Sequence, residues 1–126
     1  MQMKSISKLE QQVMDVVWQF KGCSVRNVVE KLQSTRQLAY TTVATILQRL
    51  YDKGMVERKE GKQGHVYYPK LSKQSYSKKL AKSFLSNFFK SYGDTAIASF
   101  AETIEELPEE KRKYFLELFN EYEKNK

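Results

Sequence analysis

Apolar residues in the first third of the chain recur three or four positions apart, the spacing that gathers them on one face of a helix. Ser7 and Glu10 have the spacing of a capping box, so a first helix is expected to start there and to stop at Lys21–Gly22. Ser24 is placed to cap a second, shorter helix that ends near Leu32. The apolar faces of these two helices consist of Leu9, Val13, Val16, Val17 and Phe20, and of Val25, Val28, Val29 and Leu32.

A third helix is expected from about Tyr40 to Lys53, with Gly54 placed as its C-terminal cap. Its buried stripe carries Val43, Ile46, Leu47 and Leu50. Its other face carries Thr41, Thr42, Thr45, Gln48 and Arg49. Asp52 is the only acid in this stretch, whereas surface helices more often alternate Glu with Lys. The helix therefore has one face to bury and one nearly acid-free polar face.

The pattern then changes to that of strands, over Met55–Lys59 and again over Val66–Tyr68. Residues 60–64 between them include two glycines, which would let the backbone turn tightly. Pro69 ends the second strand because proline has no N–H to donate to a ladder. These features predict a β-hairpin with a basic tip.

Three more helices are expected beyond the hairpin: Lys73–Tyr92, Thr95–Glu105, and a last one with Pro108 at its first helical position. Their apolar faces could fill an enlarged monomeric core. We favour a homodimer, because an amphipathic helix whose apolar face has no partner in its own chain must find one on another. The candidate dimerisation residues are Leu80, Phe84, Leu85, Phe88, Phe89, Phe115, Leu118, Phe119 and Tyr122.

The order of these elements predicts a fold that is mainly α with a small β-hairpin. Three short helices followed by a hairpin is the order of a winged helix-turn-helix domain, in which the third helix enters the major groove of DNA. We therefore expect a winged-helix DNA-binding domain in residues 1–71 and a helical dimerisation domain in residues 72–126.

The polar face of the third helix is the first candidate site. Hydroxyl, amide and guanidinium groups at helical spacing can reach base edges and phosphates, although the same face could be an ordinary solvated surface. The hairpin could add contacts to a phosphate or to the minor groove, although hairpin tips are also charged for solubility alone. The candidate DNA-binding residues are Tyr40, Thr41, Thr42, Thr45, Gln48 and Arg49 on the helix, and Arg58, Lys59 and Lys62 on the hairpin.

The charge of the chain agrees with an anionic partner. In 126 residues, 22 Lys and Arg stand against 15 Asp and Glu, a net charge of +7. Residues 72–92 contain five lysines and no acid, whereas acids predominate in residues 93–126. Charge alone leaves an anionic membrane possible, but no apolar run reaches the roughly 18 residues needed to cross a bilayer. A cytoplasmic protein without a membrane partner is expected.

The sequence contains no recognisable catalytic or metal-binding motif. The single cysteine, Cys23, cannot form an internal disulfide; it could be a redox sensor at a helix start or simply a small turn residue. His65 could be a ligand or a general base, but it has no second His and no Cys nearby, so we interpret it as a strand residue. We therefore expect no enzymatic activity, no metal and no cofactor.

Three segments between Ile6 and Pro69 carry a resemblance to a known family. In these segments the chain resembles the BlaI/MecI penicillinase repressors and the related copper-responsive repressors, and the resemblance continues more weakly through the C-terminal helices. It implies a dimer that binds dyad-symmetric operators in double-stranded DNA and represses antibiotic-resistance or other genes until a signal removes it. The segments are Ser7–Glu10 with Val13–Met14 and Val17–Trp18, Ala39–Leu50 with Lys53–Gly54, and Val66–Pro69.

The resemblance also assigns residues. It places Thr41, Thr42, Thr45 and Arg49 at the DNA, with Tyr40 at the entry of the third helix. Ala44 stands where some members carry a basic side chain, so the resemblance does not fix the exact operator sequence. The copper-responsive branch ends in paired Cys-x-Cys motifs, which this chain lacks, so copper sensing is disfavoured.

A regulatory protease is the last partner that the resemblance implies. Penicillinase repressors are cut before a phenylalanine, in a short helix that precedes the final one, by a membrane-bound metalloprotease sensor. The corresponding bond here joins Ser99 and Phe100. Ser99 replaces the usual asparagine, so either the protease differs or the repressor answers another signal.

Together these observations predict a homodimeric transcriptional repressor that binds a dyad-symmetric operator through its third helix and a basic wing. The alternative is a protein-interaction module of winged-helix shape, in which the third helix would bind a protein and the charge would be incidental. An enzyme is a distant third, because no catalytic constellation is present.

Overall fold

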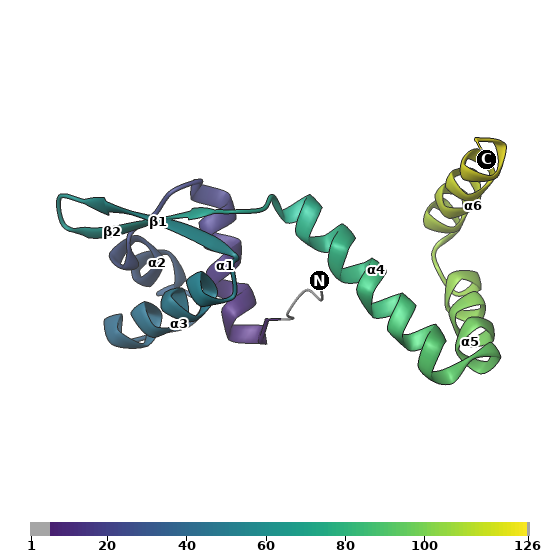
Figure 1. The fold of residues 1–126 in the computed structure, drawn as a ribbon, viewed down its shortest axis with the longest axis horizontal. Helices are drawn as coiled ribbons and strands as arrows, with labels where there is room; N and C mark the ends of the chain where they lie inside the picture. The colour runs from purple at the N-terminus through teal and green to yellow at the C-terminus, as the bar shows by residue number, and fades with distance from the viewer. Residues whose placement is uncertain (1–5, 126) are drawn as a thin grey trace. The chain divides into compact units, whose positions relative to one another are not determined.

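The computed structural model describes residues 6–125, which form six helices and one two-stranded antiparallel hairpin (Figure 1). The chain divides into two compact units, Met1–Lys82 and Ser83–Lys126. The expected mainly α fold with a small hairpin is confirmed. The elements are α1 (Lys8–Phe20), α2 (Val25–Leu32), α3 (Tyr40–Asp52), β1 (Val56–Gly61), β2 (Gly64–Pro69), α4 (Lys73–Tyr92), α5 (Asp94–Glu105) and α6 (Glu109–Lys124).

The first two helices begin at reciprocal caps. The Ser7 hydroxyl accepts the Glu10 N–H at 3.1 Å, and the Glu10 carboxylate accepts the Ser7 N–H at 2.8 Å, which is the capping box that the sequence predicts. Ser24 and Asn27 repeat this exchange at the start of α2. Lys21 ends α1 with φ 57°, in the left-handed conformation that follows many helices.

The core of the first unit lies between α1, α2, α3 and the hairpin. Its side chains are mostly Val, Leu, Ile and Met, packed from the apolar stripes of the three helices. A short bridge ties the base of the hairpin to the turn between α1 and α2: the Cys23 N–H donates to the Tyr67 carbonyl at 3.0 Å, and the reverse bond measures 2.8 Å. Burial raises the pKa of the Cys23 thiol to about 11, which disfavours the thiolate that a redox sensor needs.

The hairpin is longer than its apolar pattern predicts. Pairing continues from Val56 opposite Pro69 to Gly61 opposite Gly64, so the five-residue tip expected at residues 60–64 was wrong. Only residues 62–63 form the turn. Gly64 takes φ +109°, which side chains other than glycine rarely adopt, and this allows the ladder to extend past the apolar residues to the polar tip.

The start of α4 packs with the first unit. The Trp18 indole N–H donates to the Leu71 carbonyl at 2.8 Å, and the Trp18 and Tyr76 ring centroids lie 5.8 Å apart. Tyr76 is 2% exposed and belongs to the core cluster. The first compact unit therefore extends past Leu71, where the sequence places the end of the first domain, to Lys82.

The second unit is held together by aromatic rings. The Phe100 ring of α5 lies 5.8 Å from Phe89 of α4 and 6.3 Å from Phe115 of α6, edge to face in both cases. Pro108 is the N-cap of α6 and not its first helical residue, because its ψ of 145° is extended. Among residues 6–125, no helix is both long and apolar enough to cross a membrane.

One buried ion pair connects α1 with the end of α3. Glu10 is 4% exposed, and both of its carboxylate oxygens accept from the Lys53 ammonium, at 2.9 and 3.0 Å. Burial raises the pKa of Glu10, but hydrogen bonds from the Ser7 backbone, Lys53 and the Ser7 hydroxyl outweigh it and hold the pKa below its usual value. The carboxylate is therefore ionised at neutral pH.

We expect Glu10→Gln to lower the free energy of unfolding at pH 7 by about 2 kcal/mol, because it leaves the Lys53 ammonium without its carboxylate. Since folding lowers the Glu10 pKa, this advantage of the natural chain is complete above the unfolded pKa, near 4.5, and is lost as the pH falls through the folded pKa. Urea unfolding at several pH values measures both. Glu57→Gln, at an exposed position of β1, is the control; an equal loss in both variants would contradict the assignment.

Candidate nucleic-acid interface

The third helix separates its side chains into two faces. Val43, Ile46, Leu47 and Leu50 are at most 3% exposed, and they fix the rotation of α3 against the core. The rotation leaves a polar face outside, as the sequence predicts. The exposed side chains on this face are Tyr40, Thr41, Thr42, Thr45, Gln48 and Arg49.

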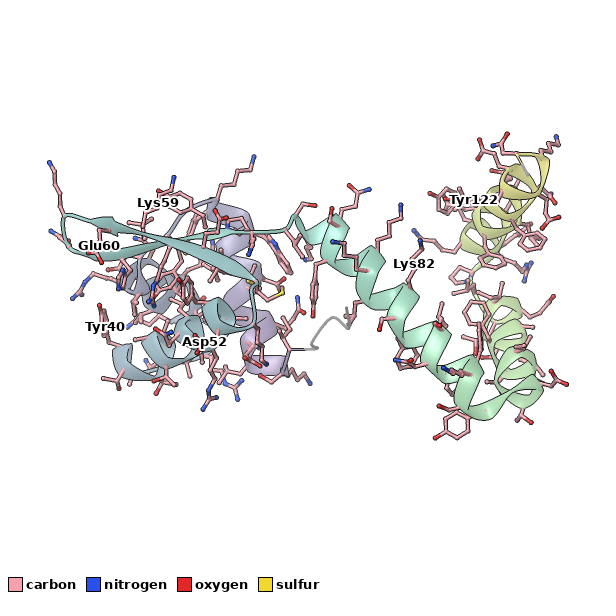
Figure 2. The ribbon with its side chains drawn as sticks, viewed as in Figure 1. Tyr40, Asp52, Lys59, Glu60, Lys82 and Tyr122 are labelled. Atoms are coloured by element: carbon pink, nitrogen blue, oxygen red, sulfur yellow. The ribbon has the colours of Figure 1, made fainter. Side chains whose placement is uncertain are left out.

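The start of α3 presents backbone donors. Ala39, the N-cap, has no side chain that can accept from the first-turn N–H groups, and no side-chain cap is present. Tyr40 is 51% exposed at this end of the helix, opposite Asp52 (Figure 2). The Thr45 hydroxyl donates to the Thr41 carbonyl at 2.9 Å, so Thr45 offers its methyl group and oxygen lone pairs outward.

The far end of the polar face is occupied by a chain of hydrogen bonds from the hairpin. Arg58 of β1 donates through Nη1 to Gln48 Oε1 at 2.6 Å, and Gln48 Nε2 donates to Asp52 Oδ1 at 3.0 Å. The Arg58 guanidinium carbon lies 4.0 Å from the centroid of the Tyr51 ring. The sequence analysis missed Tyr51 and Asp52; the spacing of four residues between Gln48 and Asp52 was the available signal.

The basic residues of the hairpin separate into two groups. Arg58 faces α3, whereas its neighbour Lys59 lies on the opposite face, as alternation along a strand requires, with its Nζ 5.4 Å from the Tyr68 ring. Figure 2 shows Lys59 on the side of the hairpin away from α3. Lys62 is exposed in the turn. The structure thus brings Arg58 to the residues of α3 and leaves Lys59 and Lys62 on the outside of the wing.

His65 lies on β2 opposite Glu60, with its Nδ1 3.1 Å from Glu60 Oε1. Within residues 6–125, no third His, Cys, Asp or Glu joins them to form a group that could hold a metal ion. His65 is therefore a strand residue of the wing with one carboxylate neighbour.

The nine candidate dimerisation residues occupy different surroundings. Leu80 packs against the core of the first unit, and Phe89 and Phe115 pack within the second unit. Leu85, Phe88 and Leu118 are half-buried. Phe84, Phe119 and Tyr122 are 64%, 56% and 72% exposed, and Phe84 continues through Phe88 into Tyr92 as a row of rings along α4.

The candidate cleavage bond lies inside α5. Ser99 is exposed, and its carbonyl accepts from the Thr103 hydroxyl at 2.9 Å. Phe100 is half-buried between Phe89 and Phe115. A protease can therefore reach this peptide bond only after the surrounding turn of α5 has unwound.

Sequence comparisons with known proteins agree on one family. The family model described as penicillinase repressor matches residues 6–120. The methicillin resistance regulatory protein MecI of Mammaliicoccus sciuri is 30% identical over 97 residues, which are 77% of this chain and 79% of that protein. The penicillinase repressor of Staphylococcus aureus is 25% identical over 119 residues, 94% of each chain.

A solved structure is similar as well. It is the solution structure of the Bacillus licheniformis BlaI monomeric form in complex with the blaP half-operator. It is 28% identical to this chain, with a TM-score of 0.50, and the match covers 60% of this chain and 92% of that one.

Proposed function

The chain belongs to the penicillinase repressor family, and from this premise we propose that it binds a dyad-symmetric DNA operator as a homodimer and represses transcription. Members of the family are transcriptional repressors, which confirms the prediction that the chain is not an enzyme. The observation that carries the proposal is the exposed face of α3, which bears threonine, glutamine and arginine side chains. This face points to solvent because the opposite, apolar face packs in the core. A similar repressor, BlaI, has been solved with a half-operator.

Each part of α3 offers a different contact. The first-turn N–H groups have no side-chain cap and suit a phosphate, because a helix N-terminus favours negative charge. The Thr45 methyl group suits the methyl of thymine. Arg49 is exposed on the polar face and can reach a guanine edge or a phosphate.

The wing adds nonspecific affinity in this proposal. Lys59 and Lys62 are both exposed, and the Lys59 ammonium lies 5.4 Å from the Tyr68 ring. Their ammonium groups suit phosphates beside the groove that α3 enters. The alternative, a winged-helix module for a protein partner, differs in salt dependence: phosphate contacts lose orders of magnitude in affinity between low and moderate salt, whereas an apolar protein interface does not.

A second copy of the chain is the proposed partner of the second unit. The exposed rings of Phe84 and Tyr92, with Phe119 and Tyr122, place apolar surface in water that a dimer would bury. Dimerisation would place two α3 helices on half-sites about 10 base pairs apart or a multiple of that. The two half-sites then bind cooperatively through effective concentration.

Release from DNA is proposed to follow cleavage between Ser99 and Phe100. The cut would separate Phe100 from the α4 side of the second unit, and with it the contact to Phe89 at 5.8 Å. The rings of α5 and α6 would lose their attachment to α4. Dimer affinity would fall, and the cooperative binding of two half-sites would fall with it.

We expect Arg49→Ala to weaken operator binding by about 1 to 3 kcal/mol. A loss confined to certain base pairs indicates base readout, and a uniform loss indicates a phosphate contact. Fluorescence anisotropy with an operator selected from random duplex DNA measures the affinity. Arg26→Ala, at an exposed position of α2, removes the same charge from a different helix and is the control. Unchanged affinity of the Arg49 variant would refute the assignment of α3 as the reading helix.

We expect Phe84→Glu to shift the full chain from dimer to monomer, because it puts a charge into an apolar row that is exposed in the single chain. The first unit should stay folded and keep its affinity for a half-operator, but the chain should lose about tenfold or more on the full operator. Analytical ultracentrifugation and anisotropy measure these quantities. Ser86→Glu, exposed on the same helix, is the control. A Phe84 variant that stays dimeric would exclude this row of rings from the interface.

We expect cleavage at an engineered protease site replacing Ser99–Phe100 to abolish both dimerisation and operator occupancy. The rings on the two sides of the cut would no longer belong to one chain. The same site placed after Lys124, at the end of α6, is the control, because cleavage there leaves the aromatic contacts intact. Full operator occupancy after complete cleavage at residues 99–100 would eliminate proteolytic release.

A further inference from the structure

We propose that Arg58 of the wing is a positioning residue that holds the Gln48 amide on α3 and so sets the base preference of the reading helix. This inference rests on the proposed function. It departs from the simpler assignment of Arg58 as a phosphate contact of the wing. The geometry that carries it is the chain of contacts from β1 to the exposed face of α3.

The chemistry of the two neighbours fixes the orientation of the amide. Arg58 has only donors and Asp52, when ionised, has only acceptors. The Gln48 carbonyl oxygen must therefore face Arg58, at 2.6 Å, and its nitrogen must face Asp52, at 3.0 Å. Turning the amide over would set two donors against each other and two acceptors against each other. The positions of the Gln48 amide oxygen and nitrogen are thus set by Arg58 and Asp52.

The guanidinium is itself held in place. It stacks over the Tyr51 ring at 4.0 Å, a distance at which the cation interacts favourably with the face of the ring. Arg58 is also half-buried and faces α3, whereas Lys59 and Lys62 are exposed on the outside of the wing. The stacked, hydrogen-bonded guanidinium is therefore engaged within the protein, unlike the two lysines.

A fixed amide discriminates between bases better than a free one. Gln48 keeps one N–H donor and one carbonyl lone pair, and their directions are set by Arg58 and Asp52. A glutamine can pair with adenine through one donor and one acceptor in defined positions. Without Arg58 the amide could rotate to match a donor or an acceptor of another base. The wing thus acts on sequence preference through α3 without touching a base.

A double-mutant cycle tests this in the full chain. Arg58→Ala, Gln48→Ala and the double variant are measured by anisotropy on an operator selected by the natural chain from random duplex DNA, and on its single-base substitutions. We expect Arg58→Ala to lose about tenfold on the selected operator, to lose preference at the base pair that Gln48→Ala also relaxes, and to cost almost nothing further in the Gln48→Ala background.

The salt dependence separates positioning from phosphate contact. A phosphate contact contributes about 0.9 to the slope of log affinity against log salt, so Lys59→Ala should lower the slope by about that amount and weaken all sequences alike. Arg58→Ala should leave the slope unchanged. Arg58→Lys keeps the charge but lacks the planar guanidinium that stacks on Tyr51. It should therefore relax the base preference as Arg58→Ala does.

The outcomes are distinct. An equal loss from Arg58→Ala with and without Gln48, together with a lower salt slope, overturns the inference and makes Arg58 a phosphate contact. Arg58→Lys with natural base preference overturns it too. A natural chain that selects no duplex at any salt concentration overturns both this inference and the proposed function. Thermal unfolding of each variant, expected within a few degrees of the natural chain, verifies that these exposed and half-buried substitutions leave the fold intact.

Discussion

The Glu10 carboxylate is the constraint on which the arrangement of the first unit depends. It caps α1 through the Ser7 N–H, and it holds the Lys53 ammonium at the end of α3 at 2.9 Å, while being 4% exposed. A buried charge of this kind is tolerated only when its oxygens are satisfied, so the start of α1 and the end of α3 must meet at this point. Burial raises the pKa of Tyr76 on α4, and the negative charge of Glu10 raises it further. The Glu10 charge therefore acts on α4 as well as on α1 and α3.

With its end fixed by Glu10, α3 has little freedom left. Four apolar side chains set its rotation, so the threonine and arginine face outside follows from the core and not from any property of those polar residues. The wing is fixed by the backbone bridge between Cys23 and Tyr67 and by the contact of Arg58 with α3. A helix that is fixed in rotation, held at its C-terminal end and contacted by the hairpin is preorganised, so the proposed binding of DNA would cost it little conformational entropy.

The sequence predicts the parts of this structure that depend on local spacing. The capping box at Ser7 and the stripe of α3 are such features, and both are present. It could not predict where Arg58 points, because its partner Gln48 is ten positions away on another element and alternation alone leaves either face possible. The sequence analysis also placed Phe84 and Phe89 in one group of dimerisation residues, because both are apolar positions of the same helix. Their surroundings differ: Phe89 contacts Phe100, whereas Phe84 is 64% exposed.

The second unit differs from the first in how little it buries. Among its described residues only Ala96 is fully buried, and its rings meet at centroid distances of 5.4 to 6.3 Å while several remain exposed. In the proposed dimer, a unit with so small a core would gain much of its stability from the partner that covers its exposed rings, so folding and association would be coupled. Because so few of its residues are buried, local unfolding of α5 should cost little free energy. A peptide bond within a helix is cut when the helix is locally unfolded. In the proposed mechanism, the point of release therefore lies in the unit with the smaller core.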